Sequence, residues 1–191
     1  MSDSHPPYPT DEELVTRVQH GDQEIFGELM DRYTEKLSRY GRQFLARPEH
    51  IEDLVQDVFI KAYQNIQSVD TSRKFSSWIY RIAHNAFVNA LRAQQTAPIS
   101  YFDFDTFTAH PVYEDGHAER KEAEEMRVLV EKGIKKLDQK YREVVMLYYF
   151  ENMDYQQIAD ILHVPIGTVG IRLSRAKALL KKELPVDTTH I

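Results

Sequence analysis

The chain has 191 residues, of which 42% are hydrophobic and 28% charged, a composition typical of a globular protein with one ordinary domain or two small ones. The lack of cysteine excludes disulfides and thiolate metal sites, and neither a membrane span nor a signal peptide is expected, which favours the cytoplasm. The formal net charge of −6 argues against a nucleic-acid partner for the chain as a whole, but the charges are segregated along it.

Apolar residues recur at helical spacing through most of the chain, and no run shows the alternation that indicates a paired strand. The sequence therefore predicts an all-α fold of two small helical domains. The segment between them contains Pro98, Pro111 and Gly116, has no Lys or Arg, and is predicted to be a flexible acidic linker. The predicted division is a disordered tail over 1–9, a first domain over 10–95, the linker over 96–117, a second domain over 118–184 and a tail over 185–191.

Several helix starts are marked by residues whose side chains can accept a hydrogen bond from a helix N-terminus. The expected capping residues are Asp22, Ser76 or Ser77, Asp138 and Asp154. The helix capped by Ser76 or Ser77 is expected to begin at Trp78.

The stretch "HIEDLVQDVFIKAYQNI" predicts a helix with one apolar face. The opposite face carries acids and amides and one apolar residue: Asp53, Gln56, Asp57 and Ile60. One interpretation is an acidic docking surface for a protein partner, with Ile60 as its apolar contact. The alternative is a solvated face with a single exposed apolar residue, which is common on protein surfaces, and this stretch by itself favours that alternative.

The stretch "KFSSWIYRIAHNAFVNALR" predicts a helix with a narrow apolar stripe and a second face that mixes aromatic, Arg and amide side chains. That second face and its margin contain Trp78, Tyr80, Arg81, His84 and Asn85. Such a mixture suits single-stranded nucleic acid, because unstacked bases stack on rings while cations hold the backbone. The alternative, slightly favoured by this helix alone, is that Trp78 and Tyr80 complete the core and the polar side chains are solvated.

The stretch "YQQIADILHVPIGTVGIRLSRAKALLKK" predicts two helices joined by a short turn, as in a helix-turn-helix. The second helix has a narrow apolar stripe at Val169, Leu173, Ala176 and Leu180. Its other faces hold a surplus of cations, which favours DNA over the alternative of an ordinary helical hairpin with a solvated basic face. No HExxH, GxSxG or P-loop pattern occurs, so no catalytic residue, metal site or cofactor is expected.

Five stretches, in this order and spacing, resemble the extracytoplasmic-function (ECF) subfamily of bacterial RNA polymerase sigma factors. They are "GDQEIFGELMDRY", "EDLVQDVFIKAYQNI", "KFSSWIYRIAHNAFVNALR", "LDQKYREVVMLYYFENMDYQQIADIL" and "VPIGTV…RLSRAKALL". The resemblance implies that the first domain is sigma domain 2, which docks on core polymerase and opens the −10 element. It implies that the second is sigma domain 4, which reads the −35 duplex through the helix-turn-helix at 155–174 and the turn that follows. The linker would thread towards the RNA exit path.

The resemblance also implies roles for individual residues. The clamp of the largest polymerase subunit would be bound by Asp53, Gln56, Asp57 and Ile60. The segment from Asn65 to Phe75 would hold a base flipped from the non-template strand, and the path of that strand would be lined by Trp78, Tyr80, Arg81 and Asn85. The −35 duplex, on the upstream side of polymerase, would be contacted by Thr168, Ile171, Arg172, Ser174, Arg175 and Lys177. An anti-sigma factor is a further implied partner.

The sequence departs from the family at Gly170 and Ile171, where a basic and a small hydroxyl residue are common, and at "AQQT", where arginines often follow. The departures at Gly170 and Ile171 predict fewer polar contacts and a retuned −35 preference, since Ile171 can contact a thymine methyl. Two alternative functions remain open: a helix-turn-helix regulator that acts without polymerase, and a degenerate sigma factor that only titrates an anti-sigma protein. The first predicts tight DNA binding without core enzyme, and the second predicts protein binding without a transcript.

Overall fold

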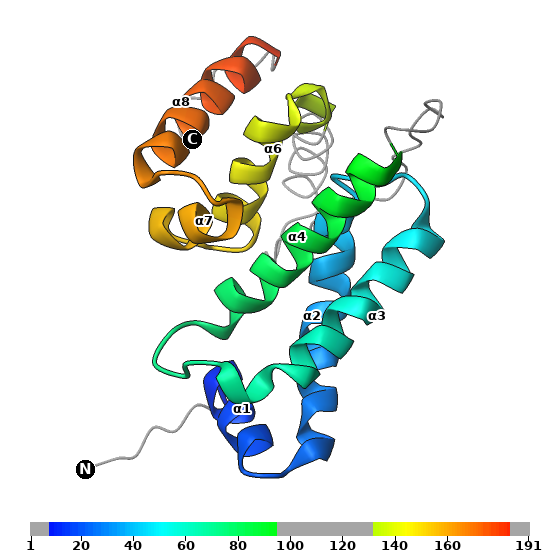
Figure 1. The fold of residues 1–191 in the computed structure, drawn as a ribbon. Helices are drawn as coiled ribbons and strands as arrows, with labels where there is room; N and C mark the ends of the chain where they lie inside the picture. The colour runs from blue at the N-terminus through cyan, green and yellow to red at the C-terminus, as the bar shows by residue number, and fades with distance from the viewer. Residues whose placement is uncertain (1–7, 95–131, 184–191) are drawn as a thin grey trace, which may run out of the picture. The chain divides into compact units, whose positions relative to one another are not determined.

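The computed structural model describes residues 8–94 and 132–183, and within these ranges it contains helices and no strand (Figure 1). The chain divides into two compact units, residues 1–103 and 104–191. The predicted all-α fold with two helical domains is therefore confirmed, while the predicted linker over 96–117 lies outside the described residues. No helix in the described part of the chain is both long and apolar enough to cross a bilayer.

The described part of unit 1, residues 8–94, contains four helices and two short 3-10 turns (Figure 1). These elements are α1 (Asp11–Gln19), η1 (Gln23–Ile25), α2 (Phe26–Gly41), α3 (Pro48–Gln64), η2 (Ile66–Ser68) and α4 (Phe75–Gln94). Helix α1 begins with a reciprocal capping box, in which the Thr10 hydroxyl accepts from the Glu13 amide over 3.2 Å and the Thr10 amide donates to the Glu13 carboxylate over 2.7 Å.

The core of unit 1 lies where α2, α3 and α4 meet, and it is rich in aromatic rings. Tyr40 contacts Phe44, Tyr80 and Phe87 at ring-centroid distances of 5.2, 5.3 and 6.2 Å. The Tyr40 hydroxyl also hydrogen-bonds to Nδ1 of the buried His84 over 3.0 Å. His84 therefore belongs to the core, although the sequence placed it on the polar face of its helix.

Gly41, the last residue of α2, permits a close approach of the other two helices. A Cβ at this position would lie 2.9 Å from Cγ2 of Ile51 on α3 and 2.9 Å from Cζ of Phe87 on α4. A side chain at this position would therefore force the side chains of Ile51 and Phe87 to shift within a packed core.

Two of the expected caps in unit 1 are wrong. Helix α4 begins at Phe75 rather than Trp78, so Ser76 and Ser77 lie inside it. The Phe75 amide instead donates a hydrogen bond to the carboxylate of Glu12 on α1 over 3.0 Å. Because Glu12 is far from Phe75 in the sequence, no local pattern reveals this partner. Asp22 makes no capping hydrogen bond and pairs with Arg17 over 2.6 Å.

Unit 2 contains a helical turn over 132–136, then α6 (Gln139–Val145), a π-helical turn η3 (Met146–Phe150), α7 (Tyr155–Leu162) and α8 (Ile166–Glu183). Its core is made by fully buried aliphatic side chains from all of these helices, including Val144, Leu147, Ile158, Ile161 and Val169. The cap predicted at Asp154 is confirmed, and the structure shows it to be one half of a capping box in which Gln157 is the reciprocal partner. Asp138 precedes α6 but makes no side-chain capping bond.

Candidate nucleic-acid interface

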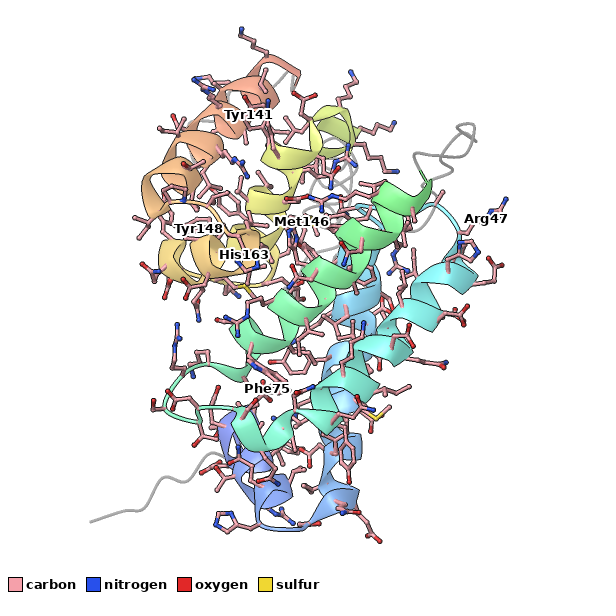
Figure 2. The ribbon with its side chains drawn as sticks, viewed as in Figure 1. Arg47, Phe75, Tyr141, Met146, Tyr148 and His163 are labelled. Carbon is pink, nitrogen blue, oxygen red and sulfur yellow. The ribbon has the colours of Figure 1, made fainter. Side chains whose placement is uncertain are left out.

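Helices α7 and α8 form the predicted helix-turn-helix, joined by the three residues from His163 to Pro165. His163, labelled at this turn in Figure 2, adopts the left-handed conformation with φ 52° and ψ 46°. This conformation ends α7, because the amides of His163 and Val164 both return to the Ala159 carbonyl. The Pro165 carbonyl then accepts from the Thr168 amide over 2.8 Å and starts α8. The turn therefore fixes the direction in which α8 leaves α7.

The faces of α8 lie as the sequence predicts. Val169, Leu173 and Ala176 are buried against α6 and α7, and Leu180 is half-buried. Ile171 is 56% exposed. Of the other candidate −35 residues, Ser174, Arg175 and Lys177 are exposed while Thr168 and Arg172 are half-buried. An exposed apolar side chain flanked by cations is thus presented on the side opposite the core.

A buried carboxylate that the sequence reasoning missed lies under α8. Glu143 of α6 is only 6% exposed, and Nε2 of Gln139 donates a hydrogen bond to it over 2.7 Å. Burial raises the pKa of Glu143 to about 6, while the hydrogen bond from Gln139 and the charges of Arg172 and Arg142 act in the opposite direction. The sequence feature that could have indicated the burial of Glu143 is its position one helical turn before Leu147, on the apolar side of the helix.

A group of tyrosines at one flank of α8, also missed from the sequence, contacts a candidate DNA-binding cation. The ring of Tyr148 lies 4.9 Å from that of Tyr149 and 5.5 Å from that of Tyr155. Nζ of Lys177 lies 5.6 Å from the Tyr149 ring centroid, and a hydrogen bond to Tyr149 raises the pKa of Lys177. Beside this cluster, a Cβ at Gly170 would lie 3.5 Å from the Tyr155 ring, an ordinary contact. Gly170 is therefore not required by packing.

The candidate −10 residues of unit 1 divide into exposed and buried sets. Asn65, Arg81 and Asn85 are exposed, and Trp78 is half-buried with its ring centroid 5.7 Å from that of Phe75. Phe75 and Tyr80 are each only 1% exposed. Both rings fill the core between α4 and α2, as the alternative interpretation expected for Tyr80, so neither ring is exposed to a DNA strand; Figure 2 labels Phe75 at the start of α4.

The candidate docking face of α3 is exposed throughout. Asp53, Gln56 and Asp57 are exposed, and Ile60 is 55% exposed, while Val55, Val58 and Phe59 of the same helix are buried. The face is thus an acidic strip with an apolar side chain at one end. Within the described ranges, no three or more His, Cys, Asp or Glu side chains are grouped as a metal site would require.

Comparisons with known proteins identify both units. The sequence model of sigma-70 region 2 matches residues 29–97, and that of sigma-70 region 4 matches residues 127–180. The chain is 33% identical to the ECF RNA polymerase sigma factor SigW of Bacillus subtilis, covering 89% of this chain and 94% of that protein. It is 34% identical to the ECF RNA polymerase sigma-E factor of Escherichia coli K12, covering 92% and 94%. The structure of CnrH in complex with the cytosolic domain of CnrY is similar, with a TM-score of 0.64, 26% identity and coverage of 93% and 98%.

Proposed function

The chain belongs to the extracytoplasmic-function sigma factors of bacterial RNA polymerase, and we propose that its two units divide promoter recognition between them. As a sigma factor it directs core polymerase to specific promoters and initiates transcription, with core polymerase and promoter DNA as its partners. Sigma factors are initiation factors and not enzymes. In this proposal the chain has no catalytic residue, needs no cofactor and works in the cytoplasm, where core polymerase synthesises the RNA.

The exposed face of α3 is the proposed docking surface for the clamp of the largest polymerase subunit. Its support is the acidic strip of Asp53, Gln56 and Asp57 beside the exposed Ile60. An exposed apolar side chain next to charged and amide side chains combines the apolar and polar contacts that protein-binding surfaces use. The negative charges of Asp53 and Asp57 favour a basic surface on the partner.

The −10 element is the proposed ligand of the loop between α3 and α4 and of the exposed side of α4. The residues that remain available for this role are Asn65, Trp78, Arg81 and Asn85. A half-buried indole can stack on an unpaired base, and Arg81 can neutralise a phosphate of the same strand. Extruding one base from the duplex costs a few kcal/mol, which these contacts would have to offset.

The −35 duplex is the proposed ligand of α8, and the exposed face of this helix is the observation that carries the proposal. A continuous buried stripe fixes α8 on unit 2, and Ile171, Ser174 and Arg175 project from the opposite side. Ile171 can contact a thymine methyl in the major groove, and Arg175 can contact a phosphate or a guanine. Thr168, Arg172 and Lys177 flank this face. Because the chain carries a formal net charge of −6, we expect it to bind DNA poorly without polymerase.

An inhibitory protein of the anti-sigma kind is a further proposed partner. Its support is the likeness to CnrH, whose structure was solved in complex with the cytosolic domain of CnrY.

Transcription from a promoter library with purified core polymerase tests the proposal directly. Sequenced transcripts should share −35 and −10 motifs, and the double variant Asp53→Asn with Asp57→Asn should weaken core binding. The matched control, Glu24→Gln with Asp31→Asn, removes two exposed carboxylates elsewhere in unit 1 and should bind core normally. Tight DNA binding without core would instead indicate an independent regulator, and core or anti-sigma binding without transcripts would indicate a titrator.

A further inference from the structure

Helix α1 lies beside the segment that leads into α4, and it precedes the part of the chain matched by the sigma-70 region 2 model (Figure 1). The hydrogen bonds between α1 and this segment join residues 47 to 63 positions apart in the sequence. Three of them join a side chain of α1 to a backbone group of the segment.

Gln19, the last residue of α1, holds the first part of the segment. Its Nε2 donates to the carbonyl of Ile66 over 2.8 Å and to the carbonyl of Val69 over 3.0 Å. In return, Nε2 of Gln67 donates to the Gln19 carbonyl over 3.3 Å. The amide of Gln19 therefore donates to the carbonyl of the first residue of η2 and to that of the residue directly after η2, which fixes the shape of that turn.

Glu12, near the start of α1, holds the other end of the segment. Its Oε1 accepts from the Phe75 amide over 3.0 Å, and its Oε2 lies 3.7 Å from Nζ of Lys74. An amide at the first position of α4 has no partner within the helix, so the carboxylate takes the place of a local cap. The Glu12 side chain is only 20% exposed, which limits its alternative positions.

Helix α1 is itself firmly attached to unit 1, so it can act as a support. Leu14 and Val15 are fully buried. Arg32 of α2 donates to Asp11 over 2.7 Å, and the Tyr33 hydroxyl donates to the same carboxylate over 2.5 Å. Between the two ends held by α1, the segment turns at Asp70, whose carboxylate accepts from the amide of Ser72 over 3.0 Å.

We propose that Gln19 and Glu12 are positioning residues that hold the segment 66–75 in the shape that receives an unstacked −10 base. This inference rests on the proposed function, which assigns base capture to the same loop. A loop ordered before binding loses less conformational entropy when the base enters, so α1 contributes to −10 recognition without contacting DNA. Loss of the support should therefore reduce discrimination at the −10 element while leaving −35 binding and core docking intact.

The test compares holoenzymes on two promoters taken from the library selection, one preferred and one with a substituted −10 base. The measured quantity is the ratio of transcription from the two promoters. Gln19→Ala should lower this ratio about tenfold, since two carbonyls lose their donor. Gln23→Ala, which removes an exposed amide from the adjacent turn η1, is the matched control and should leave the ratio unchanged.

A pair of substitutions at Glu12 separates positioning from folding. Glu12→Gln keeps an oxygen that can accept from the Phe75 amide and should retain the ratio, whereas Glu12→Ala removes the acceptor and should lower it. Thermal unfolding of each variant establishes whether unit 1 is folded at the assay temperature. If Gln19→Ala is unfolded at that temperature, the inference is tested by comparing the transcription ratios of Glu12→Gln and Glu12→Ala.

An unchanged ratio in folded Gln19→Ala, or equal ratios for both Glu12 variants, would overturn the inference. A uniform loss of transcription from both promoters would overturn it as well. Failure of the proposed function is seen separately, because the unaltered protein would then give no promoter-specific transcripts with core polymerase.

Discussion

The buried carboxylate of Glu143 on α6 interacts electrostatically with the guanidinium of Arg172 on α8, which links the core of unit 2 to its candidate DNA-binding helix. Arg172 is half-buried, whereas Arg175 on the same helix is exposed. The Arg172 side chain is therefore partly buried in unit 2 and interacts with Glu143, which leaves it less free to contact DNA. Arg175 is the cation with greater freedom to reach a phosphate.

The first prediction concerns the pH dependence of this carboxylate. Burial raises the pKa of Glu143 from 4.5 to about 6, so the folded state holds its proton more tightly than the unfolded state. Stability from this group is present below pH 4.5 and is lost as the pH rises through about 6, which costs about 2 kcal/mol at pH 7. Glu143→Gln should recover about 1–2 kcal/mol at pH 7, and this gain should disappear near pH 4.

Urea unfolding followed at pH 7 and pH 4 measures the effect. Glutamine keeps an oxygen that can accept from Gln139, so the substitution changes the charge and little else. Asp138→Asn is the control for removing an exposed carboxylate from the same unit. A variant that is less stable than the unaltered protein at pH 7 would show that attraction to the nearby arginines outweighs burial.

A second prediction concerns the close approach of helices at Gly41. Gly41→Ala should destabilise unit 1 by about 1–3 kcal/mol, because the new Cβ would lie 2.9 Å from Ile51 and Phe87. Gly27→Ala in the same helix meets nothing within 4 Å and should stabilise by up to about 1 kcal/mol. Thermal unfolding should therefore shift in opposite directions for the two variants, and equal shifts would contradict the packing described for α2.

A third prediction concerns the left-handed residue in the helix-turn-helix. His163 has φ 52°, a conformation that a side chain with Cβ adopts at a cost of about 1 kcal/mol and glycine adopts freely. His163→Gly should stabilise unit 2 by about 0.5–1 kcal/mol, and His163→Val should destabilise it.

The control for this effect is Ala178→Gly, in the exposed middle of α8, which should destabilise by about 1 kcal/mol. Unfolding by urea with circular dichroism detection is sufficient to measure all three changes. If glycine were destabilising at both positions, the turn would not have the geometry that places α8.

A fourth prediction concerns the salt dependence of −35 binding. If Arg172 and Arg175 neutralise phosphates, replacing both with Ala should weaken binding of the holoenzyme to the upstream duplex. It should also reduce the slope of log affinity against log salt concentration by about 1–2. Arg175→Ala should account for most of the change, because its side chain is exposed and that of Arg172 is half-buried.

Lys140→Ala, an exposed cation on α6, is the control and should leave the slope near that of the unaltered protein. Titration of the duplex at several salt concentrations measures the slope. A slope unaffected by the double substitution would remove both arginines from the set of phosphate contacts.

The candidate DNA-binding helix was the part of the site best anticipated by sequence. Val169, Leu173 and Ala176 repeat at helical spacing, so the exposed positions of Ile171, Ser174 and Arg175 followed from geometry alone. The burial of Phe75 was not anticipated, and that of Tyr80 was anticipated only by the alternative in which this ring completes the core. Helix α4 contacts neighbouring helices on more than one side, so its buried face is wider than its aliphatic stripe suggests. The rings of Phe75 and Tyr80 lie within this wider buried face.

By itself, the sequence determined the helical class, the two domains, the turn between α7 and α8 and the family, because each depends on local spacing or on motifs that are continuous in the chain. The tertiary structure decided which aromatic rings are buried, where α4 begins, that Glu143 lies under α8 and that α1 holds the loop before α4. These features join residues that are separated in the chain, such as Glu12 with Phe75 and Gln19 with Ile66. Their energies depend on three-dimensional packing and solvent exclusion, which no local pattern of side chains encodes.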